Sequence, residues 1–113
     1  MLDSDGSIYL GDFGVSSKLQ KGYKRTTLCG SPCWMAPEVV ESDKKGYDFS
    51  ADIWSIGIVA IELALGEPPN LHLPAMKVLV SILKNDPPTL DQTKYSKNFV
   101  HFVNSCLVKD PKK

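Results

Sequence analysis

Residues 49–65 read Phe-Ser-Ala-Asp-Ile-Trp-Ser-Ile-Gly-Ile-Val-Ala-Ile-Glu-Leu-Ala-Leu, and the rest of the chain is interpreted around them. No polar stripe follows this run at helical spacing, and a helix that is apolar nearly all round is typically buried. Asp52 and Glu62 are the polar exceptions. Because a buried carboxylate without hydrogen-bond partners is costly, we expect Asp52 to find donors elsewhere in the fold. Gly66 and the proline pair behind it end the helix.

Length and composition limit the class of protein. A chain of 113 residues is one small domain or a piece of a larger one, and 42% hydrophobic residues favour a folded core. The apolar run is too short for a membrane span, which needs about 20 apolar residues. Thirteen basic and thirteen acidic side chains cancel, so charge gives no indication of nucleic acid or anionic lipid as a partner.

The N-terminus and the cysteines favour a location inside the cell. Residues 1–6 have neither a basic segment nor an apolar core, so no signal peptide is indicated. The three cysteines form no disulfide framework, which favours a reducing, cytoplasmic compartment. Cysteines and histidines together show no recognisable zinc-finger spacing.

Short segments before the apolar run predict a loop-rich N-terminal part. A turn at Asp5-Gly6 and the strand character of residues 7–10 predict a β-hairpin whose first strand is a stub at residues 1–2. Residues 15–28 are polar and cationic without apolar periodicity, which predicts a surface loop. Two prolines make residues 30–38 a rigid platform, and Pro37 is a suitable first residue of a helix.

The segments after the apolar run predict two more helices. Residues 75–84 have an amphipathic pattern that ends before Asn85-Asp86-Pro87-Pro88. Residues 96–108 form a second amphipathic run, with phenylalanine, valine, cysteine and leucine on its inner face. The pattern as a whole predicts a mainly helical domain.

These pieces, in this order, resemble the second half of a eukaryotic protein kinase catalytic domain. Asp12-Phe13-Gly14 alone is too short a motif to be specific, but with Ala36-Pro37-Glu38 it brackets a loop of the length of an activation segment. Residues 52–57 (Asp-Ile-Trp-Ser-Ile-Gly) resemble the central kinase helix. Lys109-Asp110-Pro111 resembles the Asp-Pro before the last helix.

The resemblance implies a mainly α fold, the C-terminal lobe of the α+β protein-kinase-like fold. The activation segment would be residues 12–38 and the helical lobe residues 39–113, with the β-hairpin as a remnant of preceding structure. We expect the chain to be truncated at both ends. The N-lobe and the catalytic loop are absent, so the catalytic base would lie upstream of Met1.

Longer runs narrow the resemblance to one group of kinases. Residues 30–39 (Gly-Ser-Pro-Cys-Trp-Met-Ala-Pro-Glu-Val), 46–55 and 12–17 are similar to the sterile-twenty group of serine/threonine kinases. The branch that they resemble most is that of the oxidative-stress-responsive and proline-alanine-rich kinases. The Gly-Ser-Pro pattern implies protein substrates with Ser or Thr acceptors.

The resemblance also implies roles at the nucleotide. Asp12 would be the ligand of a Mg²⁺ that bridges the phosphates of ATP. Phe13 would pack inward and set the pose of that carboxylate, and Gly14 would allow the backbone turn. Asp12, Phe13 and Gly14 are therefore the expected cofactor site.

Other roles concern substrate, regulation and support. Ser31 and Trp34 would shape the substrate pocket, although Ser31 could be a plain turn serine before proline. Thr27, or alternatively Thr26, would be phosphorylated by an upstream activating kinase. Glu38 would pair with an arginine late in the domain, and Asp52 would accept backbone N–H groups of the catalytic loop.

Two hypotheses for function follow. The first is a piece of an ATP-dependent serine/threonine kinase of intracellular signalling. The chain alone should be inactive because it contains no Gly-rich loop, no strand lysine and no His-Arg-Asp. The alternative is a non-catalytic half-kinase that acts as a protein-binding module.

Overall fold

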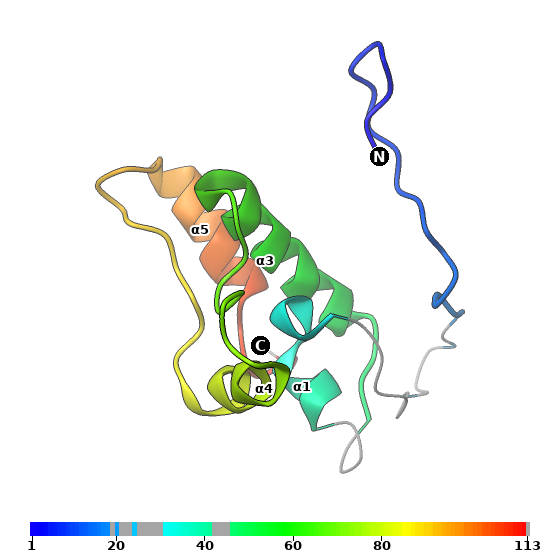
Figure 1. Cartoon of the computed structure of the whole chain (residues 1–113), viewed down its shortest axis with the longest axis vertical. Coiled ribbons are helices and arrows are strands. Elements are labelled where there is room, and N and C mark those ends of the chain that lie inside the picture. The colour runs from blue at the N-terminus through cyan, green and yellow to red at the C-terminus, as the bar shows by residue number, and fades with distance from the viewer. Residues whose placement is uncertain (19, 21–23, 25–30, 42–45, 113) are drawn as a thin grey trace.

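The computed structural model describes residues 1–18, 20, 24, 31–41 and 46–112. In chain order its elements are the 3-10 helix η1 (Pro32–Trp34) and the α-helices α1 (Pro37–Val40), α3 (Ser50–Leu65), α4 (Ala75–Lys84) and α5 (Lys97–Cys106). Figure 1 shows α5 alongside α3, with α1 and α4 grouped at one end and the first ten residues apart from the helices. The predicted mainly helical fold is confirmed.

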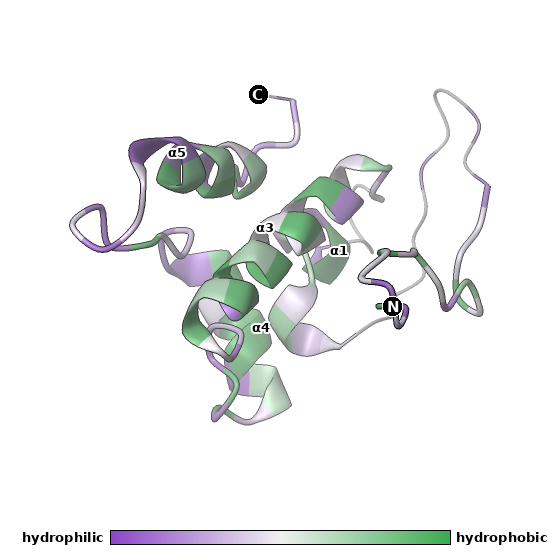
Figure 2. Cartoon of the chain, turned by 90° about the horizontal axis from the view of Figure 1, so that it is seen from above, coloured by the Kyte–Doolittle hydropathy of each residue, from purple (hydrophilic) through white to green (hydrophobic). Residues whose placement is uncertain are grey.

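Helix α3 buries one face only. Its buried face includes Trp54, Ile58 and Ile61, which belong to the hydrophobic core, and it packs against α5 and η1. The opposite face leaves Phe49, Ile53, Ile56, Val59 and Leu63 exposed, and Figure 2 shows α3 as hydrophobic along most of its length. The prediction of burial all round is therefore wrong in this chain, because the described helices cover a single side of α3.

The contact between α3 and α5 is very close. A Cβ atom added at Gly57 would lie 2.8 Å from Cys106 Cβ and 2.8 Å from Leu107 Cδ2. Val103 and Leu107, on the α5 side, are almost completely buried. The glycine in the middle of α3 is thus explained by packing, since no larger residue fits between these two segments.

The ends of the helices agree closely with the sequence pattern. Gly66 ends α3 with a left-handed φ of 88°, and its N–H donates to Glu62 O at 2.7 Å. Helix α4 has the predicted bounds, and α5 begins one residue after the predicted start because Ser96 caps it, accepting from Phe99 N at 3.3 Å. No described helix is both long and apolar enough to cross a lipid bilayer.

The N-terminal hairpin is smaller than predicted. A turn at residues 3–6 brings Leu2 and Ile8 into a single antiparallel bridge, and residues 7–10 are not a strand. Ile8 and Leu10 are exposed, so no described part of the fold supports a second strand. An isolated two-stranded hairpin is only marginally stable, which accounts for the difference.

A cluster of two carboxyls and one hydroxyl joins α1 to the start of α3. Ser50 Oγ donates to Asp48 Oδ1 at 2.7 Å and lies 3.3 Å from Glu38 Oε1. Burial raises the pKa of the Glu38 carboxyl above its usual value. Hydrogen bonds from the Ser50 side chain and backbone lower the pKa of Asp48. The expected arginine partner of Glu38 is not among the described residues, which contain no arginine.

The close α3–α5 contact leads to a first prediction. Replacing Gly57 with Ala should lower the free energy of unfolding by about 1–3 kcal/mol, because the added methyl group overpacks the contact. Urea unfolding measures the change. Leu63→Ala, on the exposed face of the same helix, is the control and should stay within about 0.5 kcal/mol of the parent. Equal stabilities for the two variants would contradict the close approach.

The carboxyl cluster leads to a pH-dependent prediction. A carboxyl with a raised folded-state pKa binds protons better when folded, so its ionisation destabilises the fold as pH rises above about 4.5, its usual value. Glu38→Gln should therefore raise the urea midpoint of the chain at pH 7, and the gain should vanish below pH 4.5. Asp48→Asn should have the opposite sign at pH 7, because an ionised Asp48 is stabilised by Ser50. A loss of stability at pH 7 in Glu38→Gln would indicate a cationic partner for Glu38.

Candidate functional site

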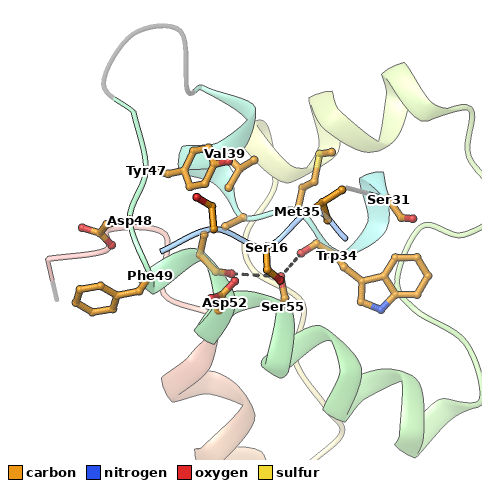
Figure 3. A pocket seen from close by; sticks show the side chains of 14 residues that line it. Ser16, Ser31, Trp34, Met35, Val39, Tyr47, Asp48, Phe49, Asp52 and Ser55 are labelled. Atoms are coloured by element: carbon orange, nitrogen blue, oxygen red, sulfur yellow. Dashed lines mark hydrogen bonds between the residues drawn. The ribbon is translucent and has the colours of Figure 1, made fainter. Parts of the chain in front are cut away.

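A cavity of about 420 Å³ lies between η1, the start of α3 and residues 15–17 (Figure 3). Three segments of the sequence therefore meet there: the stretch after Gly14, residues 31–39 (the described part of the platform and Val39), and residues 47–55, which lead into and include the first turns of α3. Its wall is formed by Val15, Ser16, Ser17, Ser31, Trp34, Met35, Ala36, Val39, Tyr47, Asp48, Phe49, Ala51, Asp52 and Ser55. Hydroxyls, an indole, a phenol and two carboxylates give this wall a mixed polar and apolar character.

Ser31 and Trp34, the two predicted substrate-pocket residues, both line this cavity. Ser31 is exposed and precedes η1, and its backbone oxygen accepts from Trp34 N at 3.2 Å. The Ser31 side chain makes no capping hydrogen bond to η1. Its hydroxyl is therefore accessible at the cavity, although no described contact assigns it a chemical role.

Two hydrogen bonds attach the platform to α3. Trp34 Nε1 donates to Glu62 Oε2 at 3.0 Å, and Ser55 Oγ donates to the Trp34 carbonyl oxygen at 2.8 Å. Figure 3 draws the second bond as a dashed line from the Ser55 hydroxyl. The residues joined by these two bonds lie 28 and 21 positions apart in the sequence. They hold η1 in place where its residues face the cavity.

Glu62 and Ser55 were not predicted as site residues. The sequence did contain a signal for Glu62, a carboxylate in an apolar helix that requires a donor, and for Trp34, whose indole N–H needs an acceptor when it is partly buried. Nothing in the spacing pairs two residues that lie 28 positions apart. Only the packing of η1 on α3 brings them together.

Asp52 is in the cavity wall but is not buried. Its side chain is exposed, and no described residue donates to it. The expectation of a buried carboxylate is therefore wrong for this chain. Asp52 lies in the first turn of α3, where the partial positive charge of the helix N-terminus favours an acid, and water can solvate it. Its expected role toward a catalytic loop stays a prediction.

Asp12 has a strained backbone. Its φ of 62° lies in the left-handed region, which is unusual for a residue other than glycine. Such conformations cost about 1–3 kcal/mol and are concentrated at functional sites. The carboxylate is exposed. Asp12 thus places an exposed carboxylate on a strained turn, and its role as a metal ligand stays a prediction.

The neighbours of Asp12 behave differently from the sequence expectation. Phe13 is 62% exposed, so the predicted inward packing of Phe13 is wrong in this chain, because no described apolar surface lies against its ring. Ser16 N donates to Phe13 O at 3.0 Å, which forms the expected turn around Gly14. Gly14 itself has no positive φ; the left-handed residue is Asp12.

Asp12 suits a Mg²⁺ ion only if groups outside the described residues supply the other ligands of that ion. The described residues contain no group of three or more His, Cys, Asp or Glu side chains that could hold a metal. Mg²⁺ commonly binds through one or two carboxylates together with substrate phosphates and water. One exposed carboxylate is consistent with that mode and not with an all-protein cage.

The predicted phosphorylation sites, Thr27 and its alternative Thr26, lie outside the described residues.

Comparison with known proteins agrees with the motifs. Residues 1–113 match the protein kinase domain family. The chain is 53% identical to the serine/threonine-protein kinase dst2 of Dictyostelium discoideum, over 98% of this chain and 10% of that protein. It is 50% identical to the germinal center kinase 3 of Caenorhabditis elegans, over 100% of this chain and 21% of that protein.

A third relative is the serine/threonine-protein kinase ppk11 of Schizosaccharomyces pombe, 50% identical over 96% of this chain and 34% of that protein. The chain thus spans between a tenth and a third of the lengths of these three relatives. The family match covers every segment described above, from the Asp12 turn to the end of α5. The chain belongs to the protein kinase domain family and corresponds to its helical part.

Proposed function

We propose that this chain is the substrate-platform part of a serine/threonine protein kinase that transfers a phosphoryl group from Mg-ATP to Ser or Thr hydroxyls of proteins. The observation that carries the proposal is the cavity whose wall includes Ser31 and Trp34, attached to α3 through Ser55 and Glu62. The names of the relatives support the acceptor class, because those cited are serine/threonine or germinal center kinases.

The finer assignment is to the sterile-twenty group, in the oxidative-stress-responsive and proline-alanine-rich branch. Residues 30–39 and 46–55 support it, together with 48% identity to the serine/threonine-protein kinase fray2 of Dictyostelium discoideum, over 100% of this chain and 11% of that protein. The proposed partners are protein substrates and an upstream activating kinase that phosphorylates Thr27 or Thr26. The proposed location is the cytoplasm.

Phosphoryl transfer depends on positioning and on neutralising charge more than on covalent chemistry. Bound Mg-ATP would supply the phosphoryl group and the metal charge. Asp12 contributes one exposed carboxylate on a strained turn, which would serve as a ligand of the Mg²⁺. Ser31 contributes a free hydroxyl beside the place where an acceptor segment would lie. Glu38 accepts from the Ser50 hydroxyl at the start of α3, and the role proposed for Asp52 is to accept backbone N–H groups of a catalytic loop.

The metal-binding role leads to a third prediction. In the full-length protein that carries this chain, Asp12→Ala should lower phosphoryl transfer from Mg-ATP by about 100-fold or more, the scale for loss of one preorganised electrostatic contact. Transfer of ³²P to a generic Ser/Thr substrate is the measurement. Asp5→Ala, on the N-terminal turn, is the control and should keep full activity. The 113-residue chain alone should give no transfer.

The same assay separates the proposal from its alternative. A full-length protein that binds substrate proteins but transfers no phosphate would favour the half-kinase binding module. Transfer by the isolated chain that Asp12→Ala abolishes would contradict the expectation that parts outside the chain supply the catalytic base.

The substrate cavity leads to a fourth prediction. In the full-length protein that carries this chain, Ser31→Ala should lower kcat/KM for a Ser-containing peptide by about tenfold, the equivalent of one hydrogen bond of about 1.4 kcal/mol. Ser31→Thr keeps the hydroxyl and should restore the rate. An unchanged kcat/KM in Ser31→Ala would mean that Ser31 has no role toward the substrate and is an ordinary turn serine before proline.

A further inference from the structure

Helix α4 carries an exposed apolar stripe. Met76, Val80 and Leu83 follow one another at spacings of four and three residues, so their side chains lie on one face of the helix. They are 70%, 47% and 38% exposed. Val78, on a different face of the same helix, is almost completely buried. The three exposed residues are called the α4 stripe below.

Other residues of α4 provide the contacts that hold it in the fold. The helix packs against η1 and α1, and Leu79 and Ile82 are partly buried against the hydrophobic core. Figure 1 shows α4 beside α1 at one end of the helical group. Among the described residues, the α4 stripe belongs neither to the core nor to the partly buried side chains packed on it. A contiguous apolar surface that the fold does not use indicates an interaction site.

Cations lie along one side of the α4 stripe. Lys77 and Lys84 each lie one position after an end residue of the stripe, so both are on the same side of it. Both are exposed, and neither makes an ion pair or a hydrogen bond with a residue that the structure describes. Lys109 adds a third cation at the end of α4, where its Nζ donates to Leu83 O at 3.0 Å. Helix α4 contains no acidic residue, and Asp86, which follows it, makes no ion pair with a described residue. The border of the α4 stripe is therefore positively charged.

The pattern of apolar and charged side chains determines the chemistry of a partner. Apolar residues at helical spacing bind an amphipathic helix that lies along them with its own apolar face toward them. Lys77 and Lys84 attract carboxylates at the edge of that helix, whereas like charges there oppose binding. A second copy of α4 is disfavoured for the same reason, because its lysines would meet these lysines.

An anionic membrane is another surface to which basic amphipathic helices bind. Two observations disfavour it here. The chain as a whole has no net charge at pH 7, so no long-range attraction to anionic lipid is expected. Val78 holds the opposite face of α4 in the fold, so insertion into lipid would depend on the α4 stripe alone. An acidic helix of a protein suits this surface better.

We propose that the α4 stripe, together with Lys77 and Lys84, is a docking site for an acidic amphipathic helix of a partner protein. The proposal is independent of the substrate role of Ser31 and Trp34, because neither the stripe nor its lysines line that cavity. Loss of docking should therefore leave phosphoryl transfer to a short Ser-containing peptide unchanged, which distinguishes this surface from the proposed substrate cavity.

Two matched peptides test the chemistry of the partner. Both form an amphipathic helix with leucine along one face; the first carries glutamate at the borders of that face, and the second carries lysine at the same positions. Each peptide is fluorescently labelled, and its binding to the intact protein that carries this chain is measured by fluorescence anisotropy. The glutamate peptide should bind about tenfold more tightly, because each border contact changes from attractive to repulsive in the lysine peptide. Added salt should reduce the difference.

Variants on α4 test the location. Val80→Asp places a charge in the middle of the α4 stripe and should abolish binding of the glutamate peptide, whereas Val80→Ile keeps the stripe apolar and should bind as the parent does. Lys77→Glu combined with Lys84→Glu should make the protein prefer the lysine peptide. The matched control combines Lys94→Glu with Lys97→Glu, at exposed positions before and at the start of α5, and should keep the preference for glutamate. The charge-reversal pair still decides the question if Val80→Asp fails to fold.

Several outcomes would overturn the proposal. Equal affinity of the two peptides would mean that the lysines take no part, and unchanged binding in Val80→Asp would mean that the peptide binds elsewhere. No binding of either peptide would mean that other parts of the intact protein cover the α4 stripe. A dimer, detected by light scattering, that Val80→Asp dissociates would make a second copy the occupant. Co-sedimentation with vesicles of phosphatidylcholine and phosphatidylserine that Val80→Asp abolishes would make the occupant a membrane.

Discussion

The packing of one face of α3 is the constraint on which the rest of the structure depends. Gly57 allows α5 to approach so closely that a single methyl group would not fit between them, and Ile58 and Ile61 bury their side chains in the same core. Once this face is fixed, the direction of every other side chain on the helix follows from the 3.6-residue period. Ser55, Glu62 and Asp52 therefore have their positions set by apolar residues that make no polar contact.

Two hydrogen bonds from η1 to α3 depend on the position of α3. The indole of Trp34 and the carboxylate of Glu62 satisfy each other, and Ser55 donates to the platform backbone. Each group would be costly to bury alone, whereas together they hold η1 against α3. Two side chains of α3, Ser55 and Glu62, therefore hold the platform in position. Because α3 also forms the hydrophobic core, core packing determines where the proposed substrate surface lies.

Residues of the turn η1 line two separate cavities. The larger has hydroxyls and carboxylates on its wall, and the smaller combines Trp54, Ile58 and three prolines with the polar residues Asn70, Ser81, Asn85 and Asp86. Adjacent residues on both η1 and α3 contribute to different cavities.

The sequence by itself determined the helical class, the bounds of α4, the stop at Gly66 and the family, because these depend on local periodicity, capping residues and motifs read in order. It also predicted that Ser31 and Trp34 belong together. Tertiary structure alone decided which face of α3 is covered, that Asp52 and Phe13 are exposed, and that Glu62 meets Trp34. Burial and pairing depend on which segments pack against a residue from distant parts of the chain, and local sequence patterns do not contain that information.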